Sequence, residues 1–253
     1  MSKPKIIIAA LILGLGLAGA YFIISYGSLD QTPKITAPEN TGNNPVGIQP
    51  VSASSTQNIT NLITQKIAES IADQNKDGFI TSSDGKTLIS APKPEKMVSD
   101  LIAEAQKNFD PNSLRPQISD SFLNISEDNS KQALINYFSS FLNIINTASK
   151  QIPDSLNNSV EDIQISDFSK MVSIHTQAIN SFYALSVPKI ALNIHKKELE
   201  LITTEKNIYE KLDNADQDPM TAFLAANELL KIENEFAILK INITDLIKKQ
   251  LLN

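Results

Sequence analysis

The chain has no cysteine and no tryptophan, and Arg115 is its only arginine. Without cysteine it can form neither a disulfide nor a zinc–thiolate site, and thiol chemistry is excluded. The formal net charge is −6, and no cluster of basic side chains stands out. Because binding to nucleic acid needs clustered Lys and Arg, we expect no nucleic-acid partner.

Glycine is also scarce, and none follows Gly85. Phosphate-binding loops, nucleophile elbows and dinucleotide-binding turns all need glycine for close backbone approach. The long C-terminal part therefore contains none of these sites. No arrangement of nucleophile, base and orienting group can be read from the chain either. We therefore expect no enzyme activity, no catalytic residues and no organic cofactor.

The first apolar run covers residues 6–24 and carries no charge. At 1.5 Å per residue, such a helix spans about 28 Å, close to the thickness of the hydrocarbon core. Lys3 and Lys5 precede the run and no lysine follows it before Lys34, which places the N-terminus in the cytoplasm. A cleaved signal peptide is the alternative, since Ala18-Gly19-Ala20 fits a cleavage site, but the apolar run continues to Ile24. We favour a single-pass anchor in the cell membrane with the rest of the chain outside.

Composition divides the chain into four parts. Residues 1–26 form the cytoplasmic tip and the anchor. Residues 27–57 are rich in Pro, Thr, Ser, Asn and Gly, a composition that predicts a disordered linker. Residues 58–92 hold a helix and a loop, and residues 93–253 are expected to form a helical bundle. With 253 residues, of which 42% are hydrophobic, the chain can bury a substantial core.

The loop at residues 73–84 reads D-Q-N-K-D-G-F-I-T-S-S-D. Calcium prefers six to eight oxygen ligands, and a twelve-residue loop supplies them from alternate positions with glycine at the sixth. Gly78 occupies that sixth position. The ligands that this spacing predicts for Ca²⁺ are Asp73, Asn75, Asp77, Phe79 through its carbonyl, Thr81 and Asp84.

This loop resembles an EF-hand loop, and its closing Asp84 makes it more similar to the dockerin-type variant. The shorter closing side chain predicts weak affinity, roughly 10⁻⁴–10⁻³ M. Apolar spacing from Ile59 predicts a helix over residues 58–72 that enters the loop. Pro92 and Pro94 limit an outgoing helix to about two turns. The alternative is a turn rich in Asp and Asn that binds nothing.

The remainder reads as helices separated by prolines. Residues 94–109 form one helix, and Ser126 or Asp128 caps another, which Pro153 ends. Three coiled-coil-like stripes then follow, which predict antiparallel neighbours in an all-α bundle joined near residues 186–188 and 213–218. Pro188 is expected to open the second of these helices, and Asp218-Pro219 to cap and open the third. The first stripe comprises Ile165, Phe168, Val172, His175, Ile179 and Phe182; the second Leu192, His195, Leu199, Ile202 and Tyr209; the third Ala222, Ala225, Leu229, Ile232, Phe236, Leu239, Ile243 and Leu246.

The two histidines, His175 and His195, both fall on these apolar stripes. One interpretation is a histidine–carboxylate metal site with Glu198 or Asp167. The other is a pair of neutral histidines satisfied inside the bundle, which we favour because two ligands do not specify a site.

Residues 120–250 resemble an uncharacterised group of single-pass helical envelope proteins of candidate phyla radiation bacteria. The segments that carry the resemblance are Ile125-Ser126-Glu127-Asp128-Asn129-Ser130-Lys131-Gln132-Ala133-Leu134 with Tyr137, Leu185-Ser186-Val187-Pro188 with His195, and Asp218-Pro219. The resemblance implies a role at the cell envelope and supplies no catalytic residue.

Two functions are expected from these features together. The first is a membrane-anchored, extracytoplasmic, calcium-binding helical protein with a structural or interaction role. The second is a subunit of a pilus-type or secretion-type envelope assembly, in which the loop is only structural and the helical stripes bind a protein partner.

Overall fold

The computed structural model describes residues 58–74, 80–81, 87–88, 94–156 and 164–251. Most of these residues lie in six α-helices, so the all-α prediction is confirmed at this level. The helices are α2 (Ile59–Gln74), α3 (Pro94–Asn108), α4 (Lys131–Ser149), α5 (Ile165–Tyr183), α6 (Leu192–Asp213) and α7 (Pro219–Leu251). The short 3-10 turns are η1 (Pro111–Leu114), η2 (Asp120–Phe122), η3 (Asp154–Leu156) and η5 (Lys189–Ala191).

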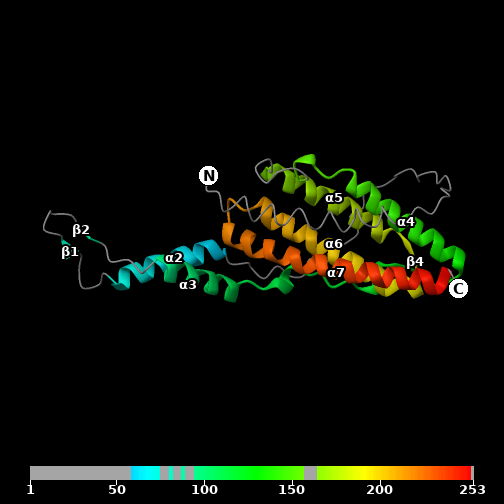
Figure 1. Ribbon diagram of the computed structural model, residues 1–253, viewed down its shortest axis with the longest axis horizontal. Coiled ribbons are helices and arrows are strands. Elements are labelled where there is room, and N and C mark those ends of the chain that lie inside the picture. Colours follow the sequence, from blue (N-terminus) through cyan, green and yellow to red (C-terminus); the bar gives the residue numbers. More distant parts are fainter. Residues whose placement is uncertain (1–57, 75–79, 82–86, 89–93, 157–163, 252–253) are drawn as a thin grey trace.

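Helices α5, α6 and α7 run antiparallel along the chain and form the bundle, with α4 packed against α5 (Figure 1). Residues of all three predicted stripes lie in the core between these helices. Phe168, Ile179 and Phe182 are buried on α5, as are Leu199 on α6 and Leu229 on α7. In the first stripe, Ile165 lies in the first turn of α5 and remains 39% exposed.

Two apolar clusters fill the bundle. One lies between α5, α6 and α7, where Phe168, Leu201 and Leu229 meet. The other lies between α4, α5 and α6, where Phe141, Phe182 and Leu199 meet. Phe141 and Phe182 stack edge to face with ring centroids 5.1 Å apart, an arrangement that aromatic rings favour. The helices are thus held mainly by burial of apolar surface.

The second bundle helix begins later than predicted, because a short strand precedes it. Strand β4 (Ser186–Pro188) pairs in parallel with β3 (Asn124–Ser126), with Ile125 opposite Val187. Pro188 is therefore extended, with φ −56° and ψ 134°, and α6 begins only at Leu192 after η5. Proline can end this ladder because it has no N–H to donate.

The N-cap of α4 also lies later in the chain than predicted, because Ser126 belongs to strand β3. Ser126 ends β3 and its hydroxyl accepts a hydrogen bond from the Asp128 backbone N–H. Asp128 in turn accepts from the Ser130 backbone N–H at 2.9 Å. Ser130 is the actual N-cap, and its side chain accepts from the Ala133 backbone N–H at 3.2 Å. The prediction of Ser126 or Asp128 as the cap is therefore wrong, because these residues form the turn that leads from the strand to the helix.

Helices α2 and α3 lie side by side as an arm that extends from the end of the bundle at which α7 begins (Figure 1). At the far end of the arm, β1 (Ile80–Thr81) pairs antiparallel with β2 (Thr87–Leu88). At its base, Ile59 and Ile63 of α2 pack with Ala105 of α3 and Leu224 of α7. The predicted helices over residues 58–72 and 94–109 thus form, with bounds shifted by one or two residues.

Among the described residues no helix is both long and apolar enough to cross a bilayer. The predicted anchor and linker, residues 6–24 and 27–57, lie outside the described part of the chain.

Candidate functional site

The predicted calcium loop lies mostly outside the described residues. Of its six proposed ligands, Asn75, Asp77, Phe79 and Asp84 are not described. Asp73 is exposed in the last turn of α2, and Thr81 belongs to β1. A helix therefore enters this loop at its first predicted ligand, as a helix–loop calcium motif requires.

The described residues that follow the predicted loop form a strand. Thr81 pairs with Thr87, and Ile80 with Leu88, so the chain is extended after the loop. The next helix, α3, begins only at Pro94. Residues 87–88 pair with residues 80–81 of the loop itself, so they belong to a strand and not to a helix.

The two histidines lie in the bundle interior but contact different partners. His175 is buried, and its Nε2 lies 3.1 Å from Oε2 of Glu205 on α6. Its Nδ1 lies 2.8 Å from the carbonyl oxygen of Met171. The predicted partner Asp167 is used elsewhere: it accepts hydrogen bonds from the Gln164 backbone and from the Ser155 hydroxyl. The metal site with Glu198 or Asp167 is not formed, and no group of three His, Asp or Glu side chains among the described residues can hold a metal ion.

His195 is fully buried and faces α4. Its Nδ1 lies 3.2 Å from the Tyr137 hydroxyl, and its ring contacts the rings of Tyr137 and Phe182. Nε2 is buried and has no hydrogen-bond partner among the described residues. Burial lowers the pKa of His195 to about 4, because a charged imidazole loses its hydration in this environment. His195 is therefore a neutral core histidine, as the sequence favoured.

Glu198 follows one helical turn after His195 and is 5% exposed. No hydrogen bond or ion pair joins its carboxyl to another described residue. Burial, with a smaller effect from the negative charge of Glu205, raises the pKa of Glu198 to about 8. The pKa of Tyr137 is raised in turn by burial and by the charge of Glu198. At neutral pH, therefore, Glu198 is mainly an uncharged acid.

Glu205 is the centre of a second group of polar contacts on the same face of α6. The Tyr209 hydroxyl donates to its Oε1 at 3.4 Å. Glu233 on α7 faces the same region, and burial together with the charge of Glu205 raises the pKa of Glu233. The Oε1 atom of Glu233 is buried without a hydrogen-bond partner among the described residues. We name the whole group the interior titratable set: Tyr137, His175, His195, Glu198, Glu205, Tyr209 and Glu233.

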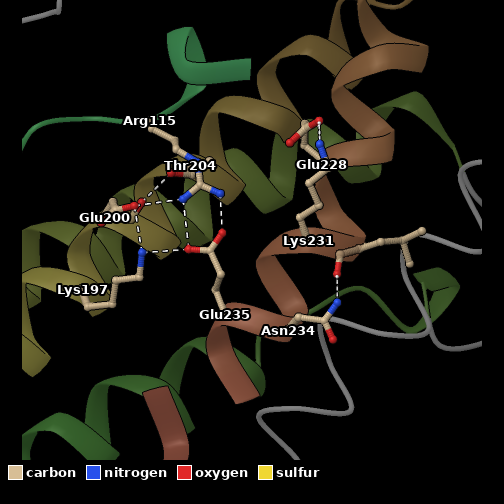
Figure 2. A network of polar contacts seen from close by, with 9 residues as sticks. Arg115, Lys197, Glu200, Thr204, Glu228, Lys231, Asn234 and Glu235 are labelled. Carbon is tan, nitrogen blue, oxygen red and sulfur yellow. Dashed lines mark hydrogen bonds and ion pairs between the residues drawn. The ribbon is translucent and has the colours of Figure 1, made fainter. Parts of the chain in front are cut away.

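A charged network lies on the opposite face of α6 (Figure 2). The Arg115 guanidinium donates to Glu200 at 2.9 Å and, through both terminal nitrogens, to Glu235. Lys197 donates to the same two carboxylates, at 3.0 and 2.8 Å. The hydrogen bonds from Arg115 are the main reason that the pKa of Glu235 is lowered. This network attaches the segment after η1 to α6 and α7.

A shallow hollow of about 400 Å³ lies beside this network, between residues 116–118 and the start of α6. Its two lysines already have partners, because Lys196 pairs with Asp120 at 2.6 Å and Lys197 belongs to the network. It therefore offers no free cation to a ligand. The described residues thus contain a buried set of titratable groups and a surface ion network.

The sequence missed Glu205 as the partner of His175. A signal was present in the second stripe, which has no apolar residue at the turn between Ile202 and Tyr209, where Lys206 stands. At this turn Glu205, not Lys206, faces α5 and His175. Which carboxylate faces an imidazole on another helix depends on helix rotation, which spacing alone does not specify.

Comparison with known proteins gives no match: neither a family model, nor a curated protein, nor a solved structure is significantly similar to this chain.

Proposed function

We propose that this protein is a membrane-anchored, extracytoplasmic helical module with a structural or interaction role and a calcium-type loop at the end of its arm. The observation that carries the proposal is the arm itself. Helices α2 and α3 extend away from the bundle, and at their far end lie strand β1, inside the predicted loop, and strand β2, just after it (Figure 1). A cation bound there would stiffen the part of the molecule most distant from the core.

The attachment of the arm supports this role. The Asp218 carboxylate, at the start of α7, accepts hydrogen bonds from the backbone nitrogens of Ile59 and Thr60 at 3.0 and 3.2 Å. A small apolar cluster lies beneath this contact. The base of the arm is thus fixed on the bundle, so a change at its tip would alter what the arm presents to a partner.

Calcium dependence of the thermal midpoint of the full chain, in detergent, tests the first part of the proposal. A ligand that binds only the folded state stabilises it by RT ln(1 + [L]/Kd), which is about 1.4 kcal/mol when calcium exceeds Kd tenfold. We expect millimolar calcium to raise the midpoint and an Asp73→Ala/Asp77→Ala double variant to lose this rise. Asp100→Ala, an exposed aspartate on α3 of the same arm, is the control and should keep it. An equal response in wild type and double variant would show that the loop is only a turn.

Membrane association tests the anchor. The full chain should remain with the membrane fraction after an alkaline wash, whereas a variant lacking residues 6–24 should be released. Protease added from outside should reach the bundle, because the lysines before the apolar run keep only the N-terminus in the cytoplasm. A mature chain whose mass shows cleavage after Ala20 would replace the anchor with a signal peptide.

The alternative, a subunit of an envelope assembly, is supported by the outer face of α7. Leu230, Ile238 and Ile241 are 44%, 58% and 60% exposed, although the predicted stripe of the same helix is used in the core. Crosslinking in cells from cysteines introduced at these positions should trap a partner protein if this function is correct. If crosslinking yields only the monomer, that result counts against a role in an envelope assembly.

A further inference from the structure

The interior titratable set holds more acid than base. Three of its members are glutamates: Glu198, Glu205 and Glu233. Of the two imidazoles in the set, that of His175 lies within ion-pair distance of one glutamate, Glu205. Among the described residues neither Lys nor Arg contacts these three carboxyl groups. A buried carboxylate without a positive partner is costly, so such groups tend to keep a proton.

The charged groups around the set come from each packed helix. Tyr137 faces Glu198 from α4, and His175 faces Glu205 from α5. Glu233 faces Glu205 from α7, and Tyr209 donates to Glu205 within α6. The positive charges of Arg115 and Lys197 belong to the network on the other face of α6, where Glu200 and Glu235 balance them. They do not compensate the interior carboxyls.

Hydrogen-bond geometry requires a proton between His175 and Glu205. The Nδ1 of His175 faces the Met171 carbonyl oxygen at 2.8 Å, and a carbonyl oxygen can only accept. Nδ1 therefore carries a hydrogen. Nε2 then faces the Glu205 carboxyl at 3.1 Å, and this contact is a hydrogen bond only if the imidazole or the carboxyl holds a further proton.

His195 and Glu198 differ from this pair because they do not contact a partner of opposite charge. His195 is fully buried against Tyr137 and Phe182, and its Nε2 has no partner. Glu198 is buried one turn later on the same helix, and the negative charge of the Glu205 carboxyl further disfavours its ionised form. In this environment both side chains are most stable without charge, so the folded bundle holds a proton on the acid and none on the imidazole.

We propose that this interior makes the bundle a pH-responsive element, which is most stable in mildly acid surroundings and loosens as the medium becomes alkaline. The proposal goes beyond the structural role argued above, since it concerns the bundle core and does not depend on calcium or on the anchor.

Glu198 and His195 change the stability of the folded state in opposite directions as pH rises. Glu198 has its pKa raised from 4.5 to about 8, so the stability it contributes is complete below pH 4.5 and is lost as pH rises to about 8. His195 has its pKa lowered from 6.5 to about 4, so its contribution is complete above pH 6.5 and is lost as pH falls toward 4. For these two residues taken together, the folded state therefore binds one proton more than the unfolded state between pH 8 and 6.5. Between pH 6.5 and 4.5 both states hold one proton, on Glu198 when folded and on His195 when unfolded, and stability is level.

Denaturant unfolding of the full chain between pH 4.5 and 9 tests the proposal. The folding equilibrium constant of the wild type should rise about tenfold for each pH unit from 8 down to 6.5, and then level off. Glu198→Gln keeps the shape of the uncharged acid and should remove this rise. His195→Gln should replace the plateau with a continued rise down to pH 4.5, because its unfolded state no longer takes up the compensating proton. The slope is the readout, so it can be measured even if a variant is less stable throughout.

Glu210→Gln is the matched control, on the same helix but with a side chain 44% exposed beside Lys206, and it should keep the wild-type slope. Infrared spectroscopy gives a second readout: the carbonyl band of a protonated carboxyl should be present in the folded wild type at pH 6.5 and weaker in Glu198→Gln. A wild-type slope in Glu198→Gln, or no such band in the wild type, would overturn the proposal.

Discussion

Asp218 and Thr60 join two helices whose first residues are far apart in the sequence. Oδ1 of Asp218 accepts hydrogen bonds from the backbone nitrogen and from the hydroxyl of Thr60, at 3.2 and 2.7 Å and across 158 residues. The same carboxylate accepts from the backbone and hydroxyl of Thr221 in the first turn of α7. One side chain therefore caps α7 and attaches the arm to the bundle. Burial opposes its charge, but the hydrogen bonds outweigh that effect and lower the pKa of Asp218.

Replacing Asp218 with Ala should destabilise the protein and loosen the arm. Loss of an N-cap costs about 0.5–2 kcal/mol, and the first turn of α2 loses its acceptor at the same time. Thermal unfolding should show the lower midpoint, and amide hydrogen exchange should quicken at Ile59 and Thr60. Asp216→Ala, at an exposed position two residues earlier, is the control. Unchanged exchange in α2 would show that the apolar cluster alone holds the arm.

Replacing Tyr137 with Phe should leave both nitrogens of His195 without a partner, since the Tyr137 hydroxyl is the only described group that contacts them. We expect a loss of about 1–3 kcal/mol, the usual cost of a buried polar group left unsatisfied. Chemical denaturation measures it. The control, Tyr183→Phe, alters a half-buried tyrosine that makes no hydrogen bond to a described residue, and should change stability little. Equal losses in the two variants would contradict a specific role for the hydroxyl.

Replacing Arg115 with Lys should weaken the network that holds the segment after η1. A guanidinium bridges two carboxylates through several N–H groups, and an ammonium cannot reproduce that geometry. Because these side chains are 25–27% exposed, the loss should be small, about 1 kcal/mol, and should shrink at high salt. A double-mutant cycle with Glu235→Gln measures the coupling. The exposed pair Lys189–Glu127 serves as the control cycle, and equal coupling in both cycles would refute this prediction.

Replacing Phe141 with Ala should cost about 3–5 kcal/mol, because it opens a cavity in a core position that is 1% exposed. Leu142, the next residue of α4, is 39% exposed, and Leu142→Ala should change the free energy of unfolding by about 0.5 kcal/mol or less. Denaturant unfolding of both variants compares the two faces of one helix. Similar losses would mean that α4 is rotated from the orientation described.

The helices and their inner faces could be predicted because the information is local. The apolar spacing of Phe168, Ile179 and Phe182 identifies one face of α5, and these residues are buried. Asp218 before Pro219 identifies the start of α7 in the same way. A helix needs only the 3.6-residue period and its end residues to be recognised, whatever it packs against.

The interior titratable set could be predicted only in part. Both histidines were expected to be buried and neutral, and His195 is neutral because burial lowers its pKa. The contact of His175 with Glu205 and the isolation of Glu198 were not foreseen. They depend on how α5, α6 and α7 are rotated about their axes, and that rotation is set by side-chain packing across the whole bundle.

The sequence by itself determined that this protein is helical, where its helices lie and which of their faces are apolar, since periodicity, caps and prolines act within a few residues. Only the tertiary structure decided that Asp218 caps two helices, that β3 and β4 pair in parallel, and that three glutamates share the bundle interior with one contacting imidazole. These relationships join residues that are distant in the chain. Whether they form depends on the free energy of packing whole helices against one another. The sequence of a single segment does not reveal that free energy.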